Sequence, residues 1–192
     1  QYATISGGYS NTANAGYSTI SGGRNNISSG FASTVSGGYF NTASGNYSIV
    51  SGGRSNTASA YMSTVGGGCT NVAGGNGSTV GGGRDNTASS TYSTIGGGYQ
   101  NVASHTYSVV SGGSLNSTYQ YAATVSGGYG NTSSGCYSTV SGGESNVASG
   151  FRSGIGSGSL NTTSNCWSRI GGGYSNTASG MYSAILGGYS NT

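Results

Sequence analysis

The stretch from Asn11 to Gly23 reads NTANAGYSTISGG and decides the fold, because the chain repeats it with small changes throughout. Related copies run from Asn41 to Gly53 (NTASGNYSIVSGG) and from Asn131 to Gly143 (NTSSGCYSTVSGG). The step between neighbouring copies is always 15 residues. A fixed period of this size is the signature of a solenoid, in which each repeat stacks on the next.

Several positions of the repeat hardly vary. Every fifteenth residue is Val or Ile from Ile5 to Ile185, Asn from Asn11 to Asn191, and Gly from Gly8 to Gly188. The column from Ser18 to Ser183 is Ser throughout, apart from Ala123. Columns of this kind indicate that equivalent residues lie above one another in successive coils.

Each repeat divides into two halves with a period of two, which is the period of a β-strand. One half follows Asn-x-Ala-x-Gly, as at Asn56 and Ala58, and the other follows Ser-x-Val-x-Gly, as at Ser138 and Val140. We expect the constant residues to point inward, the variable ones outward, and the Gly-rich joints to form bends with positive φ. The prediction is an all-β, two-faced parallel β-solenoid of about thirteen 15-residue coils, forming a single domain over residues 1–192.

A helical fold is excluded by composition, because Gly supplies 41 of the 192 residues and Ser and β-branched residues fill most of the rest. Disorder is the alternative for a Gly/Ser-rich chain of low charge. However, a random low-complexity sequence does not keep Asn and Val/Ile in phase through thirteen repeats.

The inward Asn column predicts a structural ladder, in which each amide passes hydrogen bonds to the Asn one coil above, as stacked amides do in cross-β structures. Its members are Asn11, Asn26, Asn41, Asn56, Asn71, Asn86, Asn101, Asn116, Asn131, Asn146, Asn161 and Asn176.

An outward Thr column is the candidate surface-binding face, and only Ile49 and Val109 interrupt it before Gly154. Thr simply suits an exposed strand, but a regular array of hydroxyl and methyl groups is also suited to ordering water. The column contains Thr4, Thr19, Thr34, Thr64, Thr79, Thr94, Thr124 and Thr139.

Aromatic residues form two further columns at the bends. In the second column, which includes Tyr9 and Tyr39, Arg24, Arg54 and Arg84 alternate with other residues, so we expect cation–π stacking. These columns either shield the bends or pack against another rod or a carbohydrate. The candidate association edge is the first column, with Tyr17, Tyr47, Tyr92, Tyr107, Tyr137, Trp167 and Tyr182.

The repeat loosens in two places, which mark either contacts or simple drift. One is the segment from Tyr119 to Ala123, and the other runs from Gly154 to Trp167. Arg169 and Leu186 then interrupt an otherwise regular face.

Composition argues against an enzyme and against nucleic-acid binding. The five basic residues and two acidic residues give a net charge of only +3, which is too small and scattered for a nucleic-acid footprint. His105 is the one histidine and is expected at an exposed bend, without the convergent partners that a metal site or acid–base catalysis needs. We therefore expect no cofactor. No apolar run approaches the roughly 20 residues of a membrane-spanning helix, so we expect no membrane span.

The three cysteines allow two interpretations. Cys136 and Cys166 share a column two coils apart, which separates their Cα atoms by about 9.6 Å, whereas a disulfide needs less than about 7 Å. Cys69 lies in a different column. The three cysteines are either free thiols or form a covalent bond to a neighbouring molecule. Because the chain begins and ends inside a repeat, at Gln1 and Thr192, we expect a processed product, a fragment, or one piece of a longer or end-stacked fibre.

The half-repeats resemble two known families over the whole chain. They look like the head repeats of trimeric autotransporter adhesins, and they are similar to the Asn-x-Val-x-Gly repeats of the ryegrass-type ice-binding β-roll, which carries an internal Asn ladder. The resemblance implies a left-handed β-roll. The Tyr columns and the strict 15-residue step depart from both families.

The function expected from the sequence is that of a non-enzymatic structural or adhesive module of a surface fibre or filament, located outside the cell or at its surface. Its expected partners are other copies, bound end to end or laterally, and a carbohydrate or host surface. The alternative is an ice-binding β-roll that uses a flat Thr/Ser face. A third interpretation is a carbohydrate-binding rod that uses the Tyr columns.

Overall fold

The structure is a computed structural model that describes residues 2–192, and it contains two compact units. The N-terminal unit ends at Gly98 and the C-terminal unit begins at Tyr99. Each unit is an all-β parallel β-solenoid with two strands per 15-residue coil, which confirms the predicted fold class. The left-handed sense and the single-domain assignment stay predictions.

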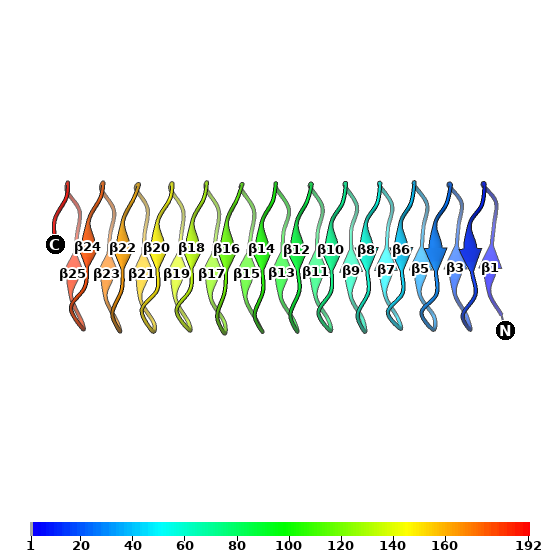
Figure 1. Cartoon of the computed structure of the whole chain (residues 1–192), viewed down its shortest axis with the longest axis horizontal. Coiled ribbons are helices and arrows are strands. Elements are labelled where there is room, and N and C mark those ends of the chain that lie inside the picture. Colours follow the sequence, from blue (N-terminus) through cyan, green and yellow to red (C-terminus); the bar gives the residue numbers. More distant parts are fainter. Residues whose placement is uncertain (1) are drawn as a thin grey trace. The chain divides into compact units, whose positions relative to one another are not determined.

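The N-terminal unit consists of two parallel sheets, one built from odd-numbered strands and the other from even-numbered strands (Figure 1). The odd-numbered strands are β1 (Thr4–Ile5), β3 (Thr19–Ile20), β5 (Thr34–Val35), β7 (Ile49–Val50), β9 (Thr64–Val65), β11 (Thr79–Val80) and β13 (Thr94–Ile95). The even-numbered strands are β2 (Thr12–Ala13), β4 (Ile27–Ser28), β6 (Thr42–Ala43), β8 (Thr57–Ala58), β10 (Val72–Ala73) and β12 (Thr87–Ala88). We call the sheet of odd-numbered strands the valine sheet and the sheet of even-numbered strands the alanine sheet, after their inward residues.

The C-terminal unit has the same design. Its valine sheet contains β15 (Val109–Val110), β17 (Thr124–Val125), β19 (Thr139–Val140), β21 (Gly154–Ile155), β23 (Arg169–Ile170) and β25 (Ala184–Ile185). Its alanine sheet contains β14 (Val102–Ala103), β16 (Ser117–Thr118), β18 (Thr132–Ser133), β20 (Val147–Ala148), β22 (Thr162–Thr163) and β24 (Thr177–Ala178).

Each strand pairs with the equivalent strand of the next coil, in parallel and without a register shift. Thr34 lies opposite Ile49, and Val35 lies opposite Val50. Backbone hydrogen bonds continue beyond the two-residue strands, since the amide of Arg24 donates to the carbonyl of Gly38 at 2.9 Å. Within each unit, every coil is therefore joined to the next along most of its length.

The core is one column deep on each sheet. The inward Val and Ile residues of the valine sheet, such as Val80, and the Ala residues of the alanine sheet, such as Ala88, are buried, except for Ile5, Ala13 and Ile185. Ser takes the place of Ala at Ser28, where its hydroxyl oxygen lies 2.7 Å from that of the facing Ser33. Buried hydroxyls at these Ala positions are satisfied either by a facing hydroxyl, as here, or by a backbone carbonyl, as where Thr118 donates to the carbonyl of Val102 at 3.4 Å.

The invariant Gly column makes the tightest bend. Gly38 has φ of 93°, in the left-handed region that favours glycine. A Cβ at Gly38 would also collide with the carbonyl oxygen of Gly53 in the next coil. The position therefore needs Gly both for its dihedral angle and for the close approach of the neighbouring backbone.

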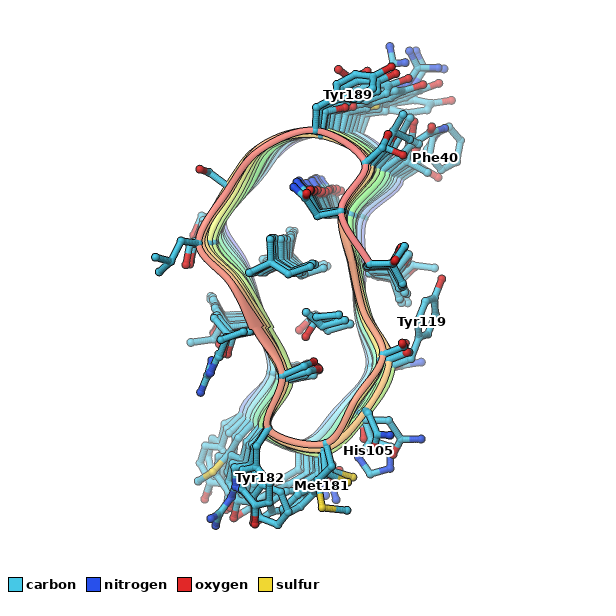
Figure 2. All side chains as sticks on the ribbon, turned by 90° about the vertical axis from the view of Figure 1, so that its left-hand side faces the viewer. Phe40, His105, Tyr119, Met181, Tyr182 and Tyr189 are labelled. Carbon is cyan, nitrogen blue, oxygen red and sulfur yellow. The ribbon has the colours of Figure 1, made fainter. Side chains whose placement is uncertain are left out.

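Each coil has two further positions with positive φ, and most copies of the repeat have a residue other than Gly there. Tyr47 (60°) and Ser55 (55°) are examples. Left-handed backbone costs a non-Gly residue about 1–2 kcal/mol. The hydrogen bonds between stacked coils maintain this backbone conformation at both bends. Figure 2 shows the large side chains of these bends pointing away from the interior.

Candidate functional site: ladders and outer faces

The Asn ladder is confirmed, and its amides are fully used inside the fold. The Nδ2 of Asn41 donates to the carbonyls of Gly37 at 2.9 Å and of Gly53 at 2.8 Å. Its Oδ1 accepts the backbone amide of Asn56, one coil on, at 3.0 Å. From Asn26 to Asn176 the ladder residues are fully buried, and Asn11 is half-buried.

The ladder differs in one respect from a simple stack of amides, because its main partners are backbone groups. Direct amide-to-amide bonds occur at some steps, for example from Nδ2 of Asn86 to Oδ1 of Asn71 at 3.1 Å. The side chain thus ties the Gly bend of its own coil to two backbone groups of the next coil. This explains why the column admits no substitute, and it leaves these amides no capacity for a ligand.

An aromatic ladder runs along the opposite bend of the N-terminal unit. The ring of Tyr17 stacks on that of Tyr2 with centroids 5.5 Å apart, and it meets Phe31 edge to face at 5.5 Å. The contacts continue from Phe31 to Tyr47 at 5.7 Å and from Tyr47 to Tyr61 at 5.8 Å. One aromatic ring is thus supplied by each of these successive coils.

The C-terminal unit has a ladder of the same kind at this bend. Its neighbouring rings lie 5.1–5.9 Å apart, edge to face except for the stacked last pair, Trp167 and Tyr182. The members in order are Tyr107, Tyr121, Tyr137, Phe151, Trp167 and Tyr182.

Only half of this arrangement was predicted from the sequence, because the prediction followed a single column. The predicted edge residues lie at the bend as expected, and Tyr92 lies there with its ring against Gly77. Phe31, Tyr61, Tyr121 and Phe151 belong to the neighbouring column. The signal was present, since each of them directly precedes a non-aromatic residue of the predicted column: Ala32, Met62, Ala122 and Arg152.

The aromatic ladder uses its ring faces internally. A sugar binds an aromatic residue through the face of the ring, and here those faces contact neighbouring rings. The side chains are still partly exposed, at 45% for Tyr47 and 36% for Trp167. This geometry supports shielding of the bend more than stacking against a carbohydrate.

The Asn-side bend carries the expected cation–π contacts. The guanidinium of Arg24 lies between the rings of Tyr9 and Tyr39, at 5.2 and 5.7 Å from their centroids. Arg84 instead forms an ion pair with its neighbour Asp85 at 3.2 Å. These charges therefore lie on a bend and not on either flat face.

The Thr column of the N-terminal unit is a regular outer face of the valine sheet. Thr64, Thr79 and Thr94 lie opposite one another in consecutive strands. Thr4, Thr19 and Thr34 form a second such run, and the β-branched Ile49 joins the two runs. In the C-terminal unit the column continues through Thr124 and Thr139 and stops at Gly154.

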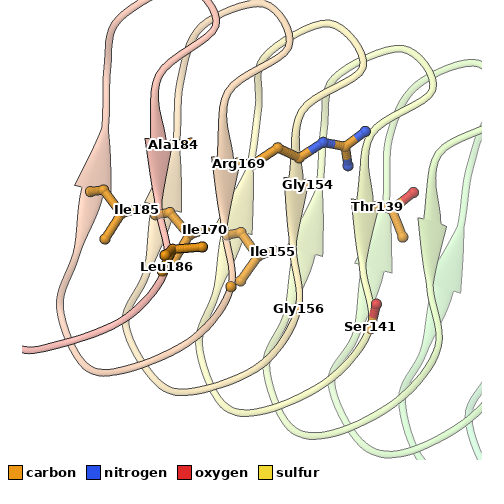
Figure 3. A pocket seen from close by; sticks show the side chains of 11 residues that line it. Thr139, Ser141, Gly154, Ile155, Gly156, Arg169, Ile170, Ala184, Ile185 and Leu186 are labelled. Atoms are coloured by element: carbon orange, nitrogen blue, oxygen red, sulfur yellow. The ribbon is translucent and has the colours of Figure 1, made fainter.

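The face of the C-terminal valine sheet contains a hollow of about 310 Å³ (Figure 3). It arises because Gly154, Gly156 and Gly171 place no side chains on the surface. The side chain of Arg169 extends across the space above Gly154, so a Cβ at that position would collide with the guanidinium. Leu186, which is 95% exposed, borders the hollow. This feature corresponds to the second stretch of loosened repeat.

The His and Cys side chains noted in the sequence do not form a common site. His105 is half-buried at its bend, less exposed than expected, and its Nδ1 accepts the backbone amide of Thr106 at 3.0 Å. Across residues 2–192, no three His, Cys, Asp or Glu side chains lie close enough to hold a metal ion. Cys69, Cys136 and Cys166 are free thiols within the chain.

In the part of the chain that the structure covers there is no helix with the length and apolarity that crossing a bilayer requires. Comparison with protein-family models finds no match to this chain, and a search of curated proteins also finds none.

Proposed function

We propose that this chain is a non-enzymatic structural or adhesive β-solenoid module of an extracellular or cell-surface fibre, which associates with further copies of itself. The observation that carries the proposal is the repetition of one hydrogen-bonded cross-section from coil to coil. The Asn amides bond to backbone groups of their own coil and of the next, as at Asn41. Such a fold provides extended surfaces, and the hollow on the valine sheet among the described residues is lined mainly by Gly, Ile, Ala and Leu, whereas catalysis uses convergent polar groups.

The distribution of charge supports self-association. In the N-terminal unit, the outer columns of both sheets contain only Thr, Ser, Ile, Val, Gly and Asn, and the charged residues lie at the bend. Soluble β proteins usually place charged side chains where extended faces or edges must be kept apart. Flat faces of small, uncharged side chains are suited to packing against another sheet at about 10 Å.

A second candidate function, ice binding, is favoured by one specific observation. The outward Thr residues of the N-terminal valine sheet follow one another in register, as between Thr79 and Thr94. A rigid, evenly spaced array of hydroxyl and methyl groups is suited to ordering a layer of water. The array contains one apolar replacement, Ile49, which keeps the β-branched shape but lacks the hydroxyl.

Electron microscopy of the native material, with an ice-recrystallisation assay on the same sample, separates these functions. Filaments or laterally associated assemblies without ice activity are the expected result. Monomers that suppress ice growth would overturn the structural proposal in favour of ice binding.

A further inference from the structure

Tyr119 is the one large side chain on the outer face of the C-terminal alanine sheet. Its column otherwise contains only Ser in this unit, at Ser104, Ser134, Ser149, Ser164 and Ser179. The Tyr119 side chain is 48% exposed, and Figure 2 shows it standing out from this face. The adjacent outward column contains Val, Ser and Thr, so Tyr119 is a single protrusion on an otherwise flat and uncharged surface.

The opposite face of the same unit has the complementary feature. The hollow of about 310 Å³ on the valine sheet lies where Gly154, Gly156 and Gly171 remove side chains from the surface. At roughly 30 Å³ for each water molecule, this space corresponds to about ten waters. Its floor is apolar, with Ile155 and Ile170 beneath the glycines.

We propose that Tyr119 of one copy inserts into the Gly154–Gly156–Gly171 hollow of a second copy. This inference rests on the proposed self-association and names its lateral contact. Two sheets of small side chains pack about 10 Å apart, and a Tyr between them would hold the faces apart. A hollow in the facing sheet would accommodate the Tyr119 ring, so that the Ser and Thr residues around Tyr119 could still contact the facing sheet.

Arg169 supplies the polar part of this contact. Its guanidinium extends across Gly154 at the rim of the hollow, and it forms no salt bridge with the residues that the structure describes. A guanidinium beside the face of a Tyr ring is attracted by the ring quadrupole. Arg169 is also the one charged residue at the outward strand positions of this sheet. A contact with the Tyr119 ring of a second copy would explain why a charged residue occurs there.

The contact is head to tail, because the protrusion and the hollow lie on opposite faces of one unit. Each copy presents both, so the association propagates and does not close into a dimer. Tyr119 lies in the same coil as Val109, and Gly154 follows Val109 by three 15-residue coils. In a parallel pair, neighbouring copies are therefore staggered by about 14 Å, at about 4.8 Å for each coil.

Two variants of the full chain remove one half of the contact each, and both use residues native to the columns. Tyr119→Ser restores the Ser column, and Gly154→Thr combined with Arg169→Thr restores the Thr column and fills the hollow. We expect each to raise the concentration needed for lateral assembly by about 30-fold or more, as for truncation of a buried hot-spot tyrosine. Sedimentation velocity and electron microscopy measure this, and thermal melting checks that the fold is kept.

The matched control is Tyr129→Ser, which makes the same change at an exposed bend column where Ser114 and Ser159 are native. It should leave assembly unchanged. The decisive test mixes the two disrupting variants in equal amounts. The Tyr119→Ser copy keeps its hollow and the Gly154→Thr/Arg169→Thr copy keeps its Tyr, so the mixture should form discrete dimers although neither variant assembles alone.

The alternative results separate this inference from the proposed function. A wild-type chain that stays monomeric would overturn both. A wild-type chain that assembles laterally, with both variants assembling equally well, would overturn the Tyr119 contact and leave the fibre proposal standing. Glycan binding that disappears in Gly154→Thr/Arg169→Thr while assembly persists would assign the hollow to a sugar and also overturn the contact.

Discussion

Asn161 is bonded twice to Asn146, because its backbone amide and its side-chain Nδ2 both donate to Oδ1 of Asn146, each at 3.0 Å. The two residues belong to successive coils and are fully buried. A buried carboxamide can be tolerated only when its donors and acceptor are paired. In this repeat, each Asn side chain forms hydrogen bonds with backbone groups of the following coil. The stability of one coil is therefore linked to that of the next.

Replacement of one ladder residue tests this dependence. Asn41→Ala would leave the carbonyl of Gly37 and the amide of Asn56 without partners, and it would remove one of the two hydrogen bonds to the carbonyl of Gly53. Each unsatisfied buried group costs about 1–3 kcal/mol. We expect a loss of about 3 kcal/mol or more, measured as a lower midpoint of urea unfolding. Asn14→Ser, at an exposed column dominated by Ser, is the control and should change little. Equal midpoints for the two variants would contradict a structural role for the ladder.

The invariant Gly column gives a second prediction, with a matched neighbour. Gly23→Ala forces Ala to a φ of 88° and drives its Cβ into the carbonyl oxygen of Gly38, so a cost well above the roughly 1 kcal/mol of left-handed backbone is expected. Gly22→Ser makes a similar change one residue earlier, where a Cβ meets open space. Thermal unfolding should separate the two variants clearly.

The aromatic ladder predicts a rescue. Tyr121→Ala removes the ring between Tyr107 and Tyr137, and two lost aromatic contacts should cost about 1–3 kcal/mol beyond the lost burial. Adding Ala122→Tyr returns a ring in the column that Tyr107 and Tyr137 occupy, with a φ of 51° already suited to that column. Chemical denaturation should show recovery in the double variant, and no recovery would mean that the position of each ring matters individually.

A charge in the thin core should unfold several coils. Val80 is fully buried on the valine sheet, and Val80→Asp would place an unpaired carboxylate there, which costs several kcal/mol. Hydrogen exchange should show lost protection in coils on both sides of β11. The control is Thr79→Asp, the preceding residue, whose side chain points outward and should keep the neighbouring coils protected.

The ice-binding alternative is tested by bulky residues on the Thr face. Thr79→Tyr with Thr94→Tyr changes two residues that lie opposite each other, and should abolish any effect on ice growth while leaving fibre formation intact. Thr42→Tyr with Thr57→Tyr makes the same change on the alanine sheet. Ice activity that survives the first pair and not the second would assign the water-ordering face to the alanine sheet.

The period of the sequence was sufficient to predict the fold, because a fixed 15-residue step leaves each residue only one possible neighbour in the next coil. Val80 and Asn41 could therefore be placed in the core from the sequence alone. The partners of the Asn amide were harder to predict, since they depend on how closely the Gly bends approach. The aromatic ladder was only half predicted, because Phe31 and Ala32 exchange roles between columns and a search along one column does not detect this.

The hollow shows a different limit of sequence reasoning. Gly154 and Arg169 stood out as departures from the repeat, but the sequence does not say which way a long side chain turns. The hollow exists because Gly154, Gly156 and Gly171 place no side chains on the surface, and Arg169 extends over Gly154 at its rim. Tyr119 likewise stood out only as a departure that marks either a contact or drift, because the sequence alone does not show which surface faces it.

The hydrogen bonds between coils also have a mechanical consequence. Within each unit they run from one coil to the next, so a force applied along the stacking direction loads the interfaces in series and opens them one at a time. Each opened coil releases 15 residues, or about 50 Å of extended chain. A material built from such units would lengthen stepwise at low force and dissipate energy, as an extensible tether does, and it would not break at a single threshold as a rigid strut does.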